Sequence, residues 1–485
     1  MNETPKATGE TVASNLIWRF AERWGAQGVS FIVSLVLARL LMPSDYGLIA
    51  LVSVTISILN VFIDSGMASA LIQKKDADDL DFSSVFYFNI FFCVVLYILL
   101  FLASPMIARL YHTPELTPVL RVVGITLLIS GVKNTQLSYV SKTMQFKRFF
   151  FATLGGTLAA AVVGIVMAYH GLGVWALVTQ QVANSFIDTV ILWITVKWRP
   201  KKVFSFQRLK GLLSFGWKML ASGLLDTVYN NVRQLIIGVM YTSEDLAFYN
   251  KGKAFPWLVI ENINSSINSV LLPAMSSVQD DTDTLRAMTR RSIKVSVYVM
   301  APIMIGLYAT ATPLIRLILT EKWLPCIPYM HIFCITYIFY PIHTANLNAV
   351  LAKGRSDIFL KLEIVKKVMG AVVLISTMWF GTLVMAYSLL FTTVMSMIIN
   401  SWPNRKLLSY TLLDQLADIL PALALSGGMG LVVHCVTFLR LNDFSTLLVQ
   451  VPLGAALYIA GSKLFHLESF EYVLSIAKGY LHKNK

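Results

Sequence analysis

Residues 15–41 read NLIWRFAERWGAQGVSFIVSLVLARLL, and residues 45–71, after a short MPS turn, read DYGLIALVSVTISILNVFIDSGMASAL. Each run is long enough to cross a bilayer as a helix, because a span needs about 20 mostly apolar residues. The break contains a proline and then Asp45, a residue type that satisfies free N–H groups at the start of a helix. The stretch therefore predicts a transmembrane helical hairpin.

The same alternation of apolar runs and polar breaks continues along the chain. Of the 485 residues, 56% are hydrophobic and only 14% are charged, whereas an average soluble domain carries about a quarter charged residues. A soluble chain of this length would need about two or three cores, and too few ionisable groups remain to cover them. The composition excludes a soluble enzyme, a disordered chain and a disulfide scaffold, and it indicates an all-α polytopic membrane protein.

Breaks at proline, glycine and charge clusters divide the chain into fourteen candidate spans. They are 15–41, 45–71, 82–111, 116–140, 149–169, 173–196, 209–240, 246–272, 289–319, 326–352, 359–380, 382–403, 416–439 and 444–464. The first 14 residues are polar, with no basic start to a short apolar segment. We therefore expect no cleaved signal peptide and a first helix that stays in the membrane.

Basic residues gather on alternate connections. The connections after even-numbered spans carry 22 Lys and Arg residues, whereas the other seven carry 6. The positive-inside rule then predicts that both termini and the basic connections face the cytoplasm. We assign the net charge of +14 to anionic membrane lipids as partners and not to nucleic acid.

A weak internal repeat suggests how the spans are grouped. Residues 42–47 (MPSDYG) and residues 242–247 (TSEDLA) both place an Asp at the start of a helix, about 200 residues apart. We expect two six-helix lobes, 15–196 and 209–403, around a central cavity, with two additional helices in 404–466. Residues 1–14 would be a cytoplasmic N-terminal segment and 197–208 a cytoplasmic linker. Residues 467–485 would be a cytoplasmic tail, either solvated or lying as an amphipathic helix in the headgroup layer.

Ionisable residues inside spans are the candidate functional residues, because burying each of them in lipid costs several kcal/mol. In the first and seventh spans they recur every three or four residues, which places them on one helix face. These stripes are Arg19, Glu22, Arg23, Gln27, Ser30 and Ser34 in the first span, and Lys218, Ser222, Asp226, Tyr229, Asn230 and Arg233 in the seventh. We expect the stripes to line a water-filled, mostly cationic cavity.

A cationic cavity suits an anionic cargo such as phosphate. We predict a substrate cavity of Arg19, Arg23, Lys133, Lys218, Arg233, Lys251 and Asn230, and coupling to H⁺ or Na⁺ at Glu22, Asp188, Asp226 and Glu261. Other interpretations stay open. Residues near helix ends can extend to the headgroups, inner ones can form ion pairs such as Asp226 with Arg233 or Lys133, and the acids can simply neutralise the cations.

The sequence contains no catalytic motif. There is no GxxxxGKS/T phosphate loop, no HExxH, no GxSxG and no His/Cys cluster. The four cysteines have neither metal-ligand nor disulfide-framework spacing. We therefore predict no catalytic residues, no metal site and no resident cofactor.

Six stretches carry a family resemblance: 40–50 (LLMPSDYGLIA), 64–74 (DSGMASALIQK), 82–89 (FSSVFYFN), 173–178 (GVWALV), 249–253 (YNKGK) and 272–276 (LPAMS). They resemble the polysaccharide-transporter family of lipid-linked oligosaccharide flippases, of the colanic-acid-exporter type, in the multidrug/oligosaccharidyl-lipid/polysaccharide exporter superfamily. The cationic residues in the first and seventh helices of that family match Arg19, Arg23, Lys218 and Arg233 by type and place.

The resemblance implies a function and partners. It implies two six-helix lobes, alternating access, and flipping of undecaprenyl-diphosphate-linked oligosaccharide repeats across the bacterial inner membrane. The flipped repeats would serve O-antigen, capsule or exopolysaccharide synthesis, with a polysaccharide polymerase and assembly proteins as partners.

Two other functions stay open. A cation-coupled multidrug exporter of the related toxin-extrusion family usually holds acids in its cavity, and the basic bias of the two stripes argues against it. A membrane polysaccharide polymerase or ligase would need a sizeable soluble loop, and the short connections argue against that.

Overall fold

The computed structural model describes the backbone of residues 9–64 and 66–483. Within this part it describes all side chains except those of residues 9–24, 64, 215, 266, 476–477 and 479–483. All regular elements in the described part are helical.

The helices match the fourteen predicted spans. In chain order they are α1 (Gly9–Leu40), α2 (Pro43–Asp64), α3 (Met67–Gln73), α4 (Asp79–Leu110), α5 (Leu116–Val123), α6 (Ile125–Lys142), α7 (Phe146–Tyr169), α8 (Val174–Thr195), α9 (Phe206–Met240), α10 (Ser243–Ser276), α11 (Thr282–Ala309), α12 (Ala311–Ile318), η1 (Glu321–Cys326), α13 (Ile327–Ile338), α14 (Tyr340–Ala352), α15 (Ser356–Thr377), α16 (Thr382–Leu407), α17 (Leu412–Cys435), η2 (Val436–Leu439), α18 (Asp443–Leu464) and α19 (Glu468–Lys483). Five predicted spans are each split into shorter helices, for example α2 with α3 and α13 with α14. The predicted all-α membrane fold is confirmed.

Nine segments of the described part combine the length and the apolarity needed to cross a membrane. Two further helices, α9 and α10, have 35 and 34 residues, which is ample length for a span. The polar residues of α9 and α10 lower the mean hydropathy of these helices, and those of α9 include the seventh-span stripe. Helices that carry candidate functional residues are thus less apolar than the nine segments above.

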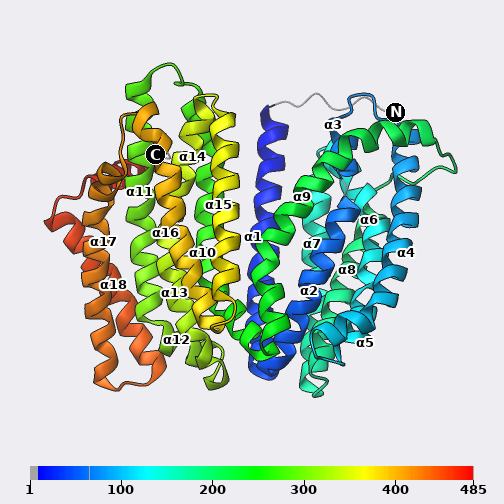
Figure 1. Cartoon of the computed structure of the whole chain (residues 1–485), viewed down its shortest axis with the longest axis horizontal. Coiled ribbons are helices and arrows are strands. Elements are labelled where there is room, and N and C mark those ends of the chain that lie inside the picture. Colours follow the sequence, from blue (N-terminus) through cyan, green and yellow to red (C-terminus); the bar gives the residue numbers. More distant parts are fainter. Residues whose placement is uncertain (1–8, 65, 484–485) are drawn as a thin grey trace. The chain divides into compact units, whose positions relative to one another are not determined.

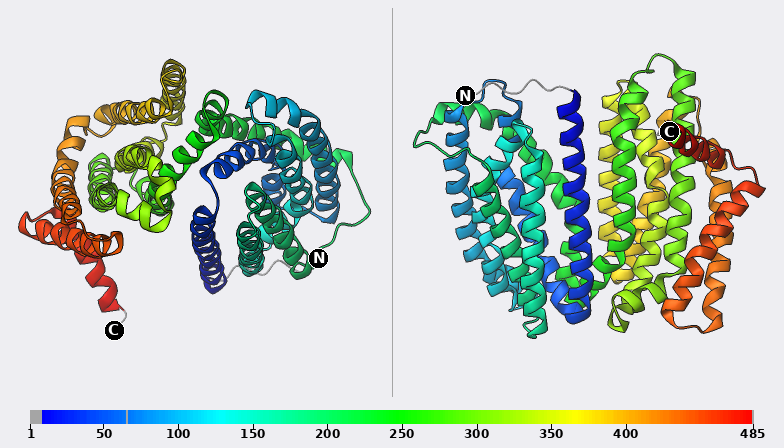
Figure 2. Two further views of the ribbon diagram at one scale, coloured as in Figure 1. Left: turned by 90° about the horizontal axis from the view of Figure 1, so that it is seen from below. Right: turned by 180° about the vertical axis from the view of Figure 1, so that it is seen from behind.

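The chain divides into two compact units, Met1–Leu246 and Ala247–Lys485, each a bundle of long helices (Figures 1 and 2). In unit 1, α7 packs on α1 and α8, while α9 packs on α2, α3 and α4. Sequence reasoning assigned residues 209–240 to the second lobe, whereas these contacts group α9 with unit 1. The division into two six-helix lobes stays a prediction.

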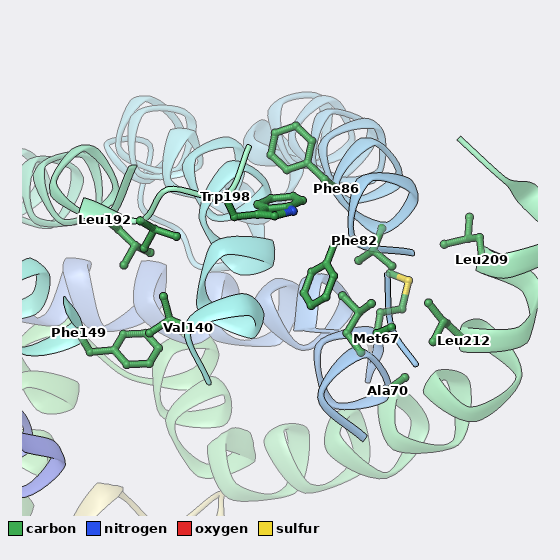
Figure 3. Packing of buried hydrophobic residues seen from close by; sticks show 14 of the residues in the cluster. Met67, Ala70, Phe82, Phe86, Val140, Phe149, Leu192, Trp198, Leu209 and Leu212 are labelled. Carbon is green, nitrogen blue, oxygen red and sulfur yellow. The ribbon is translucent and has the colours of Figure 1, made fainter. Parts of the chain in front are cut away.

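An aromatic core fixes one end of unit 1. Trp198, in the connection after α8, lies buried against Phe82 and Phe86 of α4 (Figure 3), with ring centroids 5.7 and 6.3 Å away. The connection is also held by hydrogen bonds. Gln136 Nε2 donates to the Trp198 carbonyl oxygen at 3.0 Å, and the Lys201 amide donates to Ser83 Oγ at 3.0 Å. The path of the chain out of α8 is thus set by burial of Trp198 and by these two hydrogen bonds.

The helix starts predicted at the MPSDYG and TSEDLA stretches are confirmed, although α2 and α10 begin at Pro43 and Ser243, slightly before the predicted spans. Asp45 Oδ2 accepts the Met42 amide at 3.0 Å, and Asp245 Oδ2 accepts the Thr242 amide at 3.2 Å. The Thr242 hydroxyl also accepts the Asp245 amide at 3.1 Å. Each carboxylate therefore accepts the amide of the residue just before its helix, as the third residue of a capping box does.

In unit 2, one face of α11 holds the C-terminal helices. Arg290 forms a bidentate ion pair with Asp418 of α17, with both N···O distances 2.7 Å. One turn on, Lys294 pairs with Glu468 of α19. Another turn on, the Tyr298 hydroxyl donates to Ser462 Oγ of α18 at 2.9 Å. Residues four positions apart on one face of α11 thus contact three different helices.

The tail forms the helix α19. Of the two predicted alternatives, the amphipathic helix and the solvated tail, only the first required a helix. Phe470 and Val473 of α19 pack against a hydrophobic cluster of unit 2, and α19 lies across the long helices in Figure 2. The hydrogen bond from Lys294 holds the pKa of the Glu468 carboxyl below its usual range. Docking of α19 on α11 therefore combines apolar packing with an ion pair.

Candidate functional site

The polar stripe of the seventh span lies on an accessible face of α9. Lys218, Ser222, Asp226 and Asn230 follow one another at four-residue steps, and all four are exposed. Arg233 is half-buried. Both Asp226 and Arg233 have interaction partners. Charged groups this far inside a long helix need water or a polar partner because lipid cannot solvate them, so this face suits an aqueous path.

The first-span stripe is described only in its second half. The side chains of Arg19, Glu22 and Arg23 lie outside the described residues. Of the rest, Gln27 and Ser34 are half-buried and Ser30 is exposed. The helix itself packs on α7, whereas α9 packs on α2, α3 and α4. The meeting of the two stripes around a common cavity stays a prediction.

Lys133 and Asp188, predicted for different roles, form an ion pair between α6 and α8. Their side chains are 22% and 12% exposed. Gly156 of α7 makes room for the acid, because a Cβ at this position would lie 2.8 Å from Asp188 Cβ. Sequence reasoning considered Asp226 as a partner for Lys133, and the structure supplies Asp188 instead. A buried ion pair inside unit 1 favours a structural role for both residues.

Lys251 lies against an aromatic ring within unit 2. Its ammonium is 5.4 Å from the centroid of Trp323, a distance at which a cation is attracted to the face of an indole. One residue further, α10 approaches η1 and α13 closely, since a Cβ at Gly252 would lie 2.7 Å from the Cys326 carbonyl oxygen. This packing gives Lys251 a structural partner in addition to its predicted role.

Glu261 belongs to a cluster of ionisable residues within unit 2. Glu261 of α10 and Glu363 of α15 both interact electrostatically with Tyr340 of α14. Glu363 also forms an ion pair with Lys366 at 2.5 Å. One turn from Tyr340, His343 Nδ1 lies 3.1 Å from Asn400 Nδ2 of α16. Three helices thus supply a group of acids, a lysine, a tyrosine and a histidine.

Sequence reasoning missed most of this cluster. It counted Lys366 with the basic connection before the eleventh span, but Lys366 lies at the middle of α15 (Ser356–Thr377), and its side chain is only 14% exposed. The signal was available, because Glu363 and Lys366 are three residues apart and both lie within an apolar run. Tyr340 and His343 carried no comparable signal in the sequence.

A network of amide side chains ties α14 to its neighbours. Asn346 Nδ2 donates to Gln415 Oε1 of α17 at 2.9 Å, and Asn404 Nδ2 of α16 donates to Asn346 Oδ1 at 2.7 Å. All three residues are at most 1% exposed. On α10, Asn264 Oδ1 accepts from the Thr344 hydroxyl at 2.6 Å. The residues around the ionisable cluster are therefore fixed by hydrogen bonds across four helices.

Among the described residues, no three His, Cys, Asp or Glu side chains come together as a metal site. The arrangement instead offers exposed charged groups on α9 and a half-buried ionisable cluster on α10, α14 and α15. These features suit binding and movement of a charged cargo.

A family model described as "Polysaccharide biosynthesis protein" matches residues 36–328. The chain is 25% identical to the teichuronic acid biosynthesis protein TuaB of Bacillus subtilis (strain 168) over 418 residues, which is 84% of each chain. It is 23% identical to the succinoglycan biosynthesis transport protein ExoT of Rhizobium meliloti (strain 1021) over 320 residues, covering 66% of this chain and 65% of ExoT.

Among solved structures, the fold is similar to that of the lipid II flippase MurJ in an inward closed conformation. The TM-score is 0.75 at 14% identity, and the match covers 93% of this chain and 99% of MurJ. At this identity the likeness concerns the fold alone.

Proposed function

The chain belongs to the polysaccharide biosynthesis protein family, and on that premise we propose that it flips lipid-linked oligosaccharides across the membrane by alternating access. The family match over residues 36–328 carries the proposal. Two further observations support the proposal. The relative ExoT is named a transport protein, and α9 presents an exposed charged face. The protein would act as a transporter without catalysing a covalent step.

The cargo we propose is an undecaprenyl-diphosphate-linked repeat unit for a surface polysaccharide. Its diphosphate is an anion, and Lys218 and Arg233 on α9 offer a point charge and a planar guanidinium for it. Arg19 and Arg23 on α1 would add two more cations. Lys133 and Lys251 have other partners, Asp188 and Trp323, so we expect them to contribute less to binding.

We propose coupling to H⁺ or Na⁺ through Asp226, Glu261 and Glu22, and a smaller part for Asp188, which forms an ion pair with Lys133. Asp226 lies on the accessible face of α9, and Glu261 belongs to the ionisable cluster with Tyr340, Glu363 and Lys366. Such a cluster can change its charge when a proton or a cation enters. Glu22 is a further candidate on α1.

Substitutions at Arg233 and Asp226 test these roles in proteoliposomes that contain a labelled lipid-linked oligosaccharide. Arg233→Gln should slow flipping about tenfold, equivalent to about 1.4 kcal/mol, because a phosphate contact is lost. Arg233→Lys should restore only part of the rate, since a point charge replaces a bidentate fork. Asp226→Asn should bind the cargo but lose its response to an imposed proton or sodium gradient.

Ser222→Ala is the matched control, since Ser222 is exposed on the same face and carries no charge. If Asp226 only neutralises Arg233, Asp226→Asn should destabilise the protein, and combining it with Arg233→Gln should recover part of the loss. Wild-type flipping in both single variants would remove α9 from the mechanism.

We propose that the membrane is the bacterial inner membrane, with both termini in the cytoplasm, because the basic connections follow even-numbered spans. Single cysteines placed at Lys202 and Arg290 should react with an impermeant reagent only from the cytoplasmic side. Cysteines placed at His170 and Glu321 should react only from outside. Cys435 would first be replaced by Ser, because it is exposed whereas Cys93, Cys326 and Cys334 are buried. Labelling of residue 170 from the cytoplasm would show that the helix count is wrong.

A further inference from the structure

An apolar groove with a volume of about 480 Å³ runs along the side of unit 1, between α6 and α8. Its walls include Val132 of α6 and Phe186, Val190, Trp193 and Ile194 of α8, and Arg199 lies at one end. The two walls are joined where Trp193 Nε1 donates to the Val132 carbonyl oxygen at 3.3 Å.

The groove faces outward from the bundle. Phe186 is 57% exposed and Ile194 is 74% exposed, and apolar side chains this exposed on a membrane-spanning helix contact lipid. Thr189, a polar residue of the lining, donates its hydroxyl to the Ser185 carbonyl oxygen at 2.7 Å. The groove therefore offers a binding surface for an apolar chain.

Its length suits one leaflet. The α8 wall extends from Phe186 to Ile194, a rise of eight steps along the helix, which is about 12 Å at about 1.5 Å per residue. One leaflet of a bilayer has a hydrocarbon thickness of about 15 Å, half of about 30 Å. The groove can therefore hold most of one acyl chain.

A fixed cation closes the end of the groove. The Arg199 guanidinium donates to the carbonyl oxygens of Trp193, Val196 and Trp198, the last at 2.8 Å. It also lies 5.1 Å from the centroid of the Trp193 ring. Because Trp198 is buried in the aromatic core, the backbone that carries Arg199 is held in place.

The charge of Arg199 is not neutralised by a carboxylate in the described part of the chain. Two other cations of this connection are paired, since Lys201 lies 2.6 Å from Asp79 and Arg208 lies 3.6 Å from Asp81. Arg199 satisfies the last carbonyls of α8, a common role for a basic residue at a helix end. In that role the guanidinium donates hydrogen bonds to neutral carbonyl oxygens, which do not cancel its charge. A net positive charge therefore remains at the end of the apolar groove.

We propose that this groove binds an anionic phospholipid, with one acyl chain between α6 and α8 and the phosphate at Arg199. Arg199 follows α8 on the side of the basic connections, which the positive-inside rule predicts to be cytoplasmic, and the cytoplasmic leaflet attracts basic residues through its anionic lipids. The site goes beyond cargo flipping, because its occupant is a lipid of the surrounding membrane.

Quenching of Trp193 fluorescence tests the site. The full-length protein in detergent would be titrated with phosphatidylglycerol or phosphatidylcholine whose acyl chains carry bromine. The chain contains 10 tryptophans, so subtracting the Trp193→Phe signal isolates Trp193. We expect half-maximal quenching at about tenfold less phosphatidylglycerol than phosphatidylcholine. Arg199→Gln should abolish this preference, Arg199→Lys should keep most of it, and Lys202→Gln, a matched cation outside the groove, should leave it unchanged.

The preference of the wild-type protein should also fall at 1 M salt, where the Debye length is about 3 Å, and this measurement does not depend on any variant folding. Equal quenching by the two lipids would overturn the proposal and indicate an unselective lipid shell. An unchanged preference in folded Arg199→Gln, or at 1 M salt, would overturn it as well. Displacement of the brominated lipid by equimolar undecaprenyl phosphate would assign the groove to the cargo and contradict the proposal.

Discussion

Replacing Gly47 with alanine should leave little folded protein. Gly47 lies in the first turns of α2, and a Cβ built there would lie 1.8 Å from the Ser243 carbonyl oxygen and 2.4 Å from its carbonyl carbon. Overpacking usually costs about 1–3 kcal/mol. Here the obstacle is backbone at a capped helix start, which cannot rotate away. We therefore expect a loss of about 3 kcal/mol or more in the free energy of unfolding.

Thermal unfolding in detergent, followed with the yield of monodisperse protein on size exclusion, measures this effect. Gly28→Ala and Gly211→Ala are matched controls, since both glycines are exposed in helices and nothing lies within 4 Å of an added Cβ. Alanine is the better helix former by about 1 kcal/mol, so the control variants should be unchanged or slightly more stable. A Gly47→Ala variant as stable as the controls would mean that α2 does not approach the turn between α9 and α10 this closely.

Replacing Asp188 with asparagine should destabilise unit 1 by about 3 kcal/mol, because it leaves the half-buried Lys133 ammonium without its counter-charge. The double variant Lys133→Met with Asp188→Leu should recover most of this loss, since apolar residues of similar size often replace a buried ion pair at little cost. Chemical unfolding in detergent gives both values. If Asp188 serves ion coupling alone, Asp188→Asn would keep full stability and lose only the response of flipping to an ion gradient.

The exposed pair of Lys201 with Asp79 supplies the comparison. Its side chains are 64% and 35% exposed, and exposed pairs contribute at most about 1 kcal/mol. Lys201→Met should therefore cost much less than Asp188→Asn. Equal losses would show that the Lys133–Asp188 pair is open to water and free to take part in transport.

Local sequence patterns predicted the helices because each span must present apolar side chains to lipid and form its backbone hydrogen bonds within its own segment. Apolar runs located the helices of all fourteen predicted spans, nine segments of the described part being long and apolar enough to cross a membrane. The MPSD and TSED turns predicted the caps that Asp45 and Asp245 form. Breaks inside spans were harder to predict. Gly66, at φ 68° between α2 and α3, follows Asp64 and Ser65, but apolar residues continue on both sides of this short polar group. At Tyr340, α14 begins one residue after α13 ends, and Pro341 in its first turn is the only break signal within a long apolar run.

Partners distant in sequence could not be predicted from patterns. Lys133 and Asp188 are 55 residues apart, and only the packing of α6, α7 and α8 brings them together. Lys366 was misplaced because positive-inside counting treats a lysine near a connection as a surface charge, whatever its depth. The faces of α1 and α9 were predicted from helical spacing, and the exposed side chains of α9 agree with that spacing.

Flipping by the purified protein tests the central claim most directly. Proteoliposomes would carry a fluorescent undecaprenyl-diphosphate oligosaccharide in both leaflets, and a membrane-impermeant reductant would bleach the label in the outer leaflet. If the protein flips the lipid, bleaching should continue past the outer-leaflet half toward completion, with no new glycosidic bond formed. Empty liposomes and the Gly47→Ala preparation should stop near half. Bleaching that stops near half with folded wild-type protein, or appearance of longer glycans, would contradict the account.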